Sequence, residues 1–138
     1  MKIVAKTDVG MVRESNQDSY TTGELPNGVA WAVVCDGMGG AAGGNVASST
    51  AVKVIAEQIT SSFRPGMSAN SIKNMMVSAI NAANISVYDI SCSNSELYGM
   101  GTTVVCAIVM EHIAYIAHAG DSRAYIVSHG ALTQLTRD

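Results

Sequence analysis

Four short stretches of this sequence carry residues that could bind a phosphate group or a metal ion. They are residues 13–18 (RESNQD), 36–40 (DGMGG), 101–103 (GTT) and 120–123 (GDSR). Asp18, Asp36 and Asp121 offer carboxylates, the hard oxygen ligands that Mg²⁺ and Mn²⁺ prefer. Arg13 offers a planar guanidinium that matches phosphate oxygens in a bidentate manner. A dianionic phosphate substrate needs both kinds of positive charge, the cation and the guanidinium.

Each of these residues also has an ordinary structural explanation. Asp and Gly are common in turns, so Asp36 followed by Gly37 is typical of a turn, and Asp121 is typical of a hairpin. Taken singly, Asp18 and Arg13 are typical of solvated surface charges. In the functional interpretation, Gly37 lets the backbone approach an ion, so that its carbonyl becomes a ligand beside the Asp36 carboxylate. Residue by residue, both interpretations stay open.

Other chemistries find less support in the sequence. The glycines at positions 39–44 fit neither the GxxxxGK[ST] nor the GxGxxG pattern of nucleotide-binding loops. A cysteine nucleophile is disfavoured, because the negative charge of Asp36 opposes formation of the Cys35 thiolate. The three histidines share no metal-ligand spacing.

Composition and charge narrow the class of protein. A net charge of −3 and no basic cluster argue against nucleic-acid binding. The longest apolar run, residues 104–110, is far short of the roughly 20 residues that span a bilayer, so we expect no membrane association. The three cysteines are an odd number without CxxC spacing, which is typical of reduced thiols and predicts a cytoplasmic protein.

The elements that must position the candidate residues follow from apolar patterning. Residues 30–35 predict a strand with Asp36 at its end. Helical spacing of apolar residues from position 45 predicts a helix that stops at residues 64–66. A second helix follows a serine-rich entry at 68–71, with an apolar stripe over residues 72–83 and a polar loop at 91–95.

The rest of the chain predicts strands in an antiparallel meander. They are expected at residues 102–110, 113–119, 123–127 and 131–135. Because residues 104–110 are apolar at every position, we expect that strand to be covered on both faces. The fold class is therefore α+β, with antiparallel sheets flanked by helices.

The four stretches occur together and in one order, and in this the chain resembles the PPM family of metal-dependent serine/threonine protein phosphatases (protein phosphatase type 2C), especially its bacterial members. The resembling segments are residues 10–19, 34–40, 101–103 and 119–125. The resemblance implies that Arg13 holds the substrate phosphate and that Asp36 bridges two Mn²⁺ or Mg²⁺ ions. It further implies metal-binding roles for Asp18 and the Gly37 carbonyl, and a role for Asp121 at a third ion found in some members.

The resemblance also implies a fold and its incompleteness. The family fold is an αββα sandwich, and its complete domain supplies two further metal-binding aspartates from a C-terminal half. We therefore expect residues 1–138 to be the N-terminal part of one such domain, forming a partial sandwich. Uncovered sheet edges then predict self-association, and too few ligands predict weak metal binding.

By this resemblance, the function of the complete domain is hydrolysis of phosphoserine and phosphothreonine in proteins by a water that bridges two metal ions. The substrates are expected to be phosphoproteins of a serine/threonine kinase, in signalling, with little activity in this chain alone. One alternative is a truncated, non-catalytic interaction or regulatory module. Another is an α/β binding domain unrelated to phosphatases.

Overall fold

An antiparallel sheet forms the centre of the computed structural model, which describes residues 1–40 and 42–138. Its strand order is β1-β2-β4-β5, and the short β3 pairs with the end of β2. The strands are β1 (Asp18–Leu25), β2 (Val29–Met38), β3 (Gly101–Thr102), β4 (Val104–Val109) and β5 (Ala114–Ala119). The tight turn of residues 26–28 joins β1 to β2, with Asn27 and Gly28 at positive φ angles of 67° and 72°.

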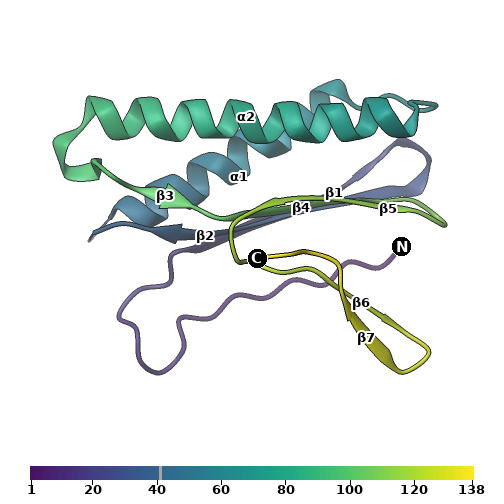
Figure 1. Ribbon diagram of the computed structural model, residues 1–138, viewed down its shortest axis with the longest axis horizontal. Coiled ribbons are helices and arrows are strands. Elements are labelled where there is room, and N and C mark those ends of the chain that lie inside the picture. Colours follow the sequence, from purple (N-terminus) through teal and green to yellow (C-terminus); the bar gives the residue numbers. More distant parts are fainter. Residues whose placement is uncertain (41) are drawn as a thin grey trace.

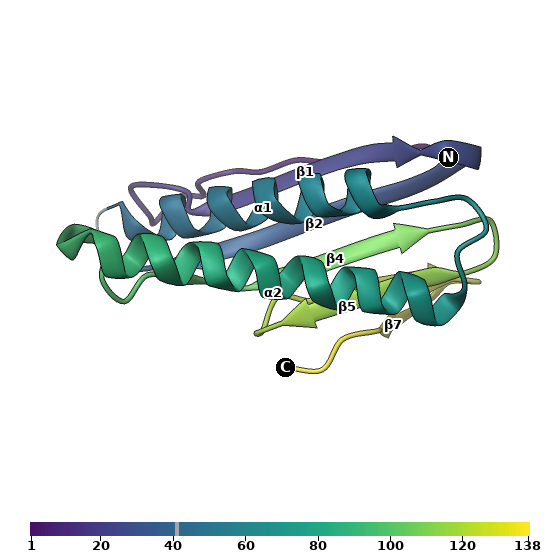
Figure 2. The same ribbon diagram turned by 90° about the horizontal axis from the view of Figure 1, so that it is seen from above.

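Two helices lie on one face of this sheet, as Figures 1 and 2 show. The first, α1 (Gly43–Ser62), ends just before residues 64–66, as the sequence predicts. The second, α2 (Ala69–Ser93), begins at the N-cap Ser68, whose hydroxyl accepts the Ser71 N–H at 3.1 Å. The predicted serine-rich entry is therefore confirmed.

The predicted loop at residues 91–95 is wrong in its first part, because α2 continues to Ser93. Ser91 is buried inside the helix, where its hydroxyl donates to the Leu97 carbonyl at 3.1 Å and accepts the Gly99 N–H at 3.0 Å. Through these two bonds, the Ser91 hydroxyl anchors the segment that returns from α2 to the sheet.

The core lies between the helices and the sheet. Its fully buried side chains come from β2, β4 and both helices: Val33, Cys35, Ile55, Ile59, Ile72, Met76, Cys106 and Ile108. Burial of this apolar surface is the main favourable contribution to folding. It fixes the backbone of β2 against the helices, and Asp36 lies on the other face of this strand.

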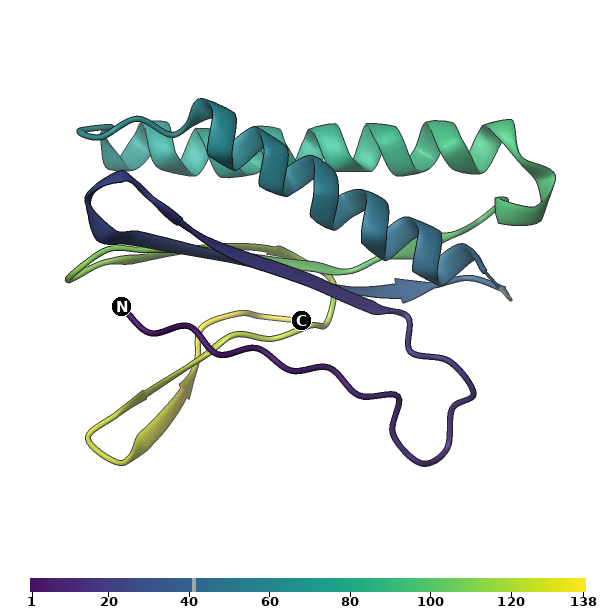
Figure 3. The same ribbon diagram turned by 180° about the vertical axis from the view of Figure 1, so that it is seen from behind.

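The opposite face of the sheet is only partly covered. Residues 1–17 run along it without regular structure, and a hairpin of β6 (Tyr125–Ser128) and β7 (Ala131–Gln134) projects beside it (Figures 1 and 3). The predicted meander is therefore wrong in one respect, because β6 and β7 form a separate two-stranded sheet. The α+β class with antiparallel sheets is confirmed.

The prediction that residues 104–110 are covered on both faces holds in part. Cys106 and Ile108 on the helix side are fully buried, and Val105 on the other side is 8% exposed, but Ala107 and Val109 are only half-buried. No described helix is long and apolar enough to cross a membrane.

Candidate metal centre

Asp18 and Asp36 lie directly opposite each other on the neighbouring strands β1 and β2. One residue further along, the Gly37 N–H donates to the Gln17 carbonyl at 3.0 Å. This alternation makes Asp18 and Asp36 a non-hydrogen-bonded pair, the kind in which cross-strand side chains come closest. The strand runs on to Met38, so Asp36 lies within β2 and not at its end as predicted.

The two carboxylates repel each other, and the pKa of Asp18 reflects this repulsion. Burial raises the pKa of Asp18, and hydrogen bonding to Asp36 and its charge raise it further, while Arg13 lowers it. Like charges directly opposite on two strands are destabilising. A cation placed between these carboxylates would relieve the repulsion.

Arg13, Asp18 and Asp36 line one hollow of about 200 Å³ on the face away from the helices. Asp8 and Asn16 also line this hollow, and the sequence did not predict a role for either of them. Asp8 accepts the Gly10 N–H through Oδ1 at 2.8 Å, within a turn of the irregular N-terminal segment.

Asn16 is the side chain that ties this segment to the strand. Its Oδ1 accepts the Asp18 N–H at 3.0 Å, and its Nδ2 donates to the Thr7 hydroxyl at 2.6 Å. Asn side chains often hydrogen-bond the backbone two residues further along the chain. This tendency is the sequence signal that could have identified Asn16.

Gly37 has a packing role that the sequence did not reveal. A Cβ at this position would overlap the Gly44 carbonyl at the start of α1. A Cβ at Gly44 would in turn lie 2.5 Å from the Gln17 side chain, whose amide donates to the Gly39 carbonyl at 3.4 Å. These glycines let the helix approach β2 closely beside the two aspartates. The role of the Gly37 carbonyl as a metal ligand stays a prediction.

Asp121 is not brought into the hollow. It is exposed in the turn after β5, beside Gly120 with its φ of 99°. Across residues 1–40 and 42–138, no three His, Cys, Asp or Glu side chains gather in a way that could hold a metal ion. The structure therefore joins Arg13, Asp18, Asp36 and Gly37 in one region and leaves Asp121 outside it.

The donors that are present suit a hard divalent cation in type but not in number. They are two carboxylates facing each other, and carboxylate oxygens are ligands of Mg²⁺ and Mn²⁺. An octahedral ion needs more donors, which water or other protein groups must supply. The hollow fits part of a metal centre.

A larger cavity of about 580 Å³ lies on the helix side of the sheet, lined by residues of α1, α2 and residues 98–102. Apolar side chains such as Ile55, Val87 and Val104 line much of it. The candidate phosphate and metal ligands are absent from its lining: Arg13, Asp18, Asp36, Gly37 and Asp121. We place the candidate site at the smaller hollow because that is where the charged groups converge.

Known proteins resemble the chain over nearly its whole length. Residues 12–138 match the family model described as protein phosphatase 2C. A protein phosphatase 2C-type protein of Streptococcus pyogenes is 36% identical over 139 residues, which cover 100% of this chain and 55% of that protein.

Solved structures agree with this match. The serine/threonine phosphatase PstP/Ppp of Mycobacterium tuberculosis superposes with a TM-score of 0.82 at 32% identity, covering 96% of this chain and 52% of that one. A structure of the PstP catalytic domain in complex with two manganese ions gives a TM-score of 0.79 at 31% identity, covering 96% of this chain and 54% of that one. The chain spans about half the length of the first curated relatives that it matches.

Proposed function

This chain belongs to the protein phosphatase 2C family, and from that premise we propose that it supplies one half of a metal-dependent phosphatase centre. The complete domain would hydrolyse phosphoserine and phosphothreonine in proteins. Asp18, Asp36 and the Gly37 carbonyl would hold Mn²⁺ or Mg²⁺, and Asp121 would contribute to a third ion. Arg13 would hold the substrate phosphate.

The observation that carries the proposal is the direct pairing of Asp18 with Asp36, with Arg13 lining the same hollow. A purely structural role would not favour two facing carboxylates, because their repulsion raises the pKa of Asp18 beyond the effect of burial. A divalent cation between them turns this repulsion into attraction. The manganese ions in the related PstP structure support the same assignment.

The chemistry divides between the metal ions and the residues of this chain. When bound, a pair of divalent cations lowers the pKa of a water molecule and neutralises charge on the phosphoryl oxygens. Asp18 and Asp36 provide oxygen donors fixed by the β1–β2 register, so little reorganisation is needed. The guanidinium of Arg13 binds two phosphate oxygens and orients the phosphorus toward the carboxylate pair. Positioning of this kind lowers the barrier by holding the reacting groups in place.

We propose that further metal ligands come from the part of the relatives that lies outside the matched half. The residues described here include no group of three metal-binding side chains, which supports weak metal binding and little turnover by this chain alone. The same observation favours the second candidate function, a non-catalytic interaction or regulatory module.

The cellular setting is also a proposal. The relatives named serine/threonine phosphatases support phosphoprotein substrates, made by a serine/threonine kinase in signalling. Three unpaired cysteines support a cytoplasmic location. Exposed side chains on the partly covered face, such as Tyr20 at 41% and Val34 at 48%, support self-association.

The test compares Mn²⁺-dependent hydrolysis of an aryl phosphate by this chain and by a version extended to the length of its relatives. We expect strong activity only in the extended protein, abolished by Asp36→Asn and kept by Asp89→Asn, an exposed aspartate of α2. Equal activity in both lengths would overturn the claim of a half-site. An extended protein that is inactive with Mn²⁺ and with Mg²⁺ would favour the non-catalytic module.

A further inference from the structure

Thr103 binds both backbone polar groups of Asp36. The Asp36 N–H donates to the Thr103 hydroxyl at 3.0 Å, and the Thr103 N–H donates to the Asp36 carbonyl at 2.9 Å. Thr103 lies between β3 and β4 and is only 4% exposed. Its buried hydroxyl therefore takes the place of a backbone carbonyl in the ladder at the position that carries the candidate ligand.

The same hydroxyl has a second partner. The Oγ atoms of Thr103 and Ser122 are 2.6 Å apart, and either can donate. The backbone of Gly120 also lies close to Thr103. A Cβ added to Gly120 would be only 2.8 Å from the Thr103 methyl group. The backbone of Asp36 is thus linked through two hydroxyls to the turn that carries Asp121.

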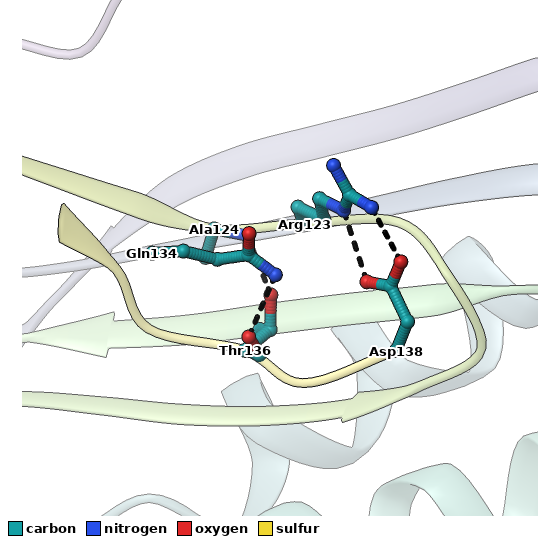
Figure 4. Close-up of polar contacts among 5 residues, drawn as sticks. All are labelled: Arg123, Ala124, Gln134, Thr136 and Asp138. Carbon is teal, nitrogen blue, oxygen red and sulfur yellow. Dashed lines mark hydrogen bonds and ion pairs between the residues drawn. The ribbon is translucent and has the colours of Figure 1, made fainter. Parts of the chain in front are cut away.

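The far side of this turn is held as well (Figure 4). Arg123 Nε donates to Asp138 Oδ1 at 2.9 Å, and its Nη2 donates to Oδ2 of the same carboxylate. The Ala124 N–H donates to the buried Thr136 hydroxyl at 3.2 Å. The turn is thus held on both flanks, by the Thr103–Ser122 hydroxyl contact on one side and by the bonds of Arg123 and Ala124 on the other.

We propose that the Thr103–Ser122 hydroxyl pair positions Asp36 for metal binding and couples it to the turn of residues 120–123. This inference rests on the proposed function of Asp36 as a metal ligand. Neither Thr103 nor Ser122 lines the hollow of Arg13, Asp18 and Asp36. They act through the Asp36 backbone, and outer groups that hydrogen-bond to metal-binding residues commonly change metal affinity by about 10- to 100-fold.

The test measures Mn²⁺ affinity of this chain by electron paramagnetic resonance of the free ion, together with the amide exchange rate of Asp36. Thr103→Val keeps the shape of the side chain and removes the hydroxyl. We expect it to weaken Mn²⁺ binding about tenfold and to speed Asp36 amide exchange. Thr103→Ser should restore both.

Ser122→Ala tests the coupling without disturbing the packing of Thr103. We expect weaker Mn²⁺ binding while the Asp36 N–H stays protected by Thr103. The double variant Thr103→Val/Ser122→Ala should bind Mn²⁺ no more weakly than Thr103→Val alone, because the two hydroxyls act as one unit. Additive losses would overturn the coupling.

A merely structural role gives a different result, in which Thr103→Val lowers the urea midpoint and leaves Mn²⁺ affinity unchanged. That outcome overturns the inference, provided that Asp36→Asn weakens Mn²⁺ binding in the same assay. If Asp36→Asn leaves Mn²⁺ binding intact, the proposed function fails, and this inference fails with it. Should Thr103→Val not fold, Ser122→Ala with unchanged affinity is sufficient to overturn the coupling.

Discussion

The two faces of the central sheet differ although the same strands build both. On β2, Val33 and Cys35 point toward the helices and are 0% exposed, whereas Val34 between them is 48% exposed. Asp36 follows on the same side as Val34 and pairs with Asp18. Successive side chains of a strand point to opposite faces, so a single strand serves both.

This difference shows how the fold carries an electrostatically unfavourable pair. The helix face buries the apolar side chains that stabilise the chain, and the other face presents two facing carboxylates. Thr103, fixed between β3 and β4, connects the two by holding the backbone of Asp36. The buried Thr103 therefore holds the backbone position from which the Asp36 carboxylate projects on the outer face.

Thiol chemistry should show the largest contrast between exposed and core positions. Burial raises the pKa of Cys35 to about 12 and that of Cys106 to about 11, from a reference value of 9.0. Since the thiolate is the nucleophile, the reactive fraction at pH 8 falls by about 100- to 1000-fold for these two. Cys92 is exposed at the end of α2.

Iodoacetamide at pH 8 should therefore label one thiol per native chain, at Cys92, and three in urea, as mass spectrometry would report. The matched control is Cys92→Ser, which should leave the native chain unlabelled. Rapid native labelling of Cys35 would contradict a sealed helix face.

Two neighbouring valines offer the direct comparison of the faces. Val33→Ala should lower the free energy of unfolding by about 2 kcal/mol, because it removes buried methyl groups and leaves a cavity. Val34→Ala should change it by no more than about 0.5 kcal/mol. Urea denaturation at several protein concentrations measures both. If Val34→Ala lowers the free energy of unfolding as much as Val33→Ala, and both losses increase with protein concentration, self-association covers the outer face.

Local sequence signals predicted the elements better than their arrangement. Apolar runs and helical periodicity identified most of β2, the cores of both helices, and β5 to β7 within a few residues. They did not predict β1, because its sequence DSYTTGEL carries little apolar pattern and the strand is stabilised by its pairing with β2. The separate β6–β7 sheet likewise depends on contacts that no local pattern encodes.

The candidate site follows the same division. The residue types of Arg13, Asp18 and Asp36 indicated phosphate and metal chemistry, and the β1–β2 register placed the two carboxylates together. The link through Thr103 was not predictable from spacing, because it joins residues 67 positions apart. The sequence predicted that Gly37 lets the backbone approach a metal ion. The structure shows that the absence of a side chain at Gly37 also lets α1 pack closely against β2.

The smallest predicted effect concerns the carboxylate pair itself without metal. The pKa of Asp18 is raised in the folded chain, so the folded state binds protons more tightly than the unfolded state does. The contribution of Asp18 to stability should therefore fall as pH rises from the unfolded value of 3.8 through the raised folded value, and then stay lowered. Asp18→Asn removes this titration and should be more stable at pH 8 in EDTA, by less than about 1 kcal/mol after solvent screening.

The urea midpoints of wild type, Asp18→Asn and Asp89→Asn from pH 3 to pH 8 test this sign. The advantage of Asp18→Asn should shrink toward pH 3, where Asp18 is mostly protonated in both states. Asp89→Asn is the control for removing an exposed carboxylate elsewhere in the chain. Excess Mn²⁺ should reverse the order at pH 8, because an ion that binds only the folded state stabilises the chain that retains both carboxylates. A loss of stability in Asp18→Asn at pH 8 in EDTA would mean that the two faces do not differ in the way described, since the outer pair would then be stabilising on its own.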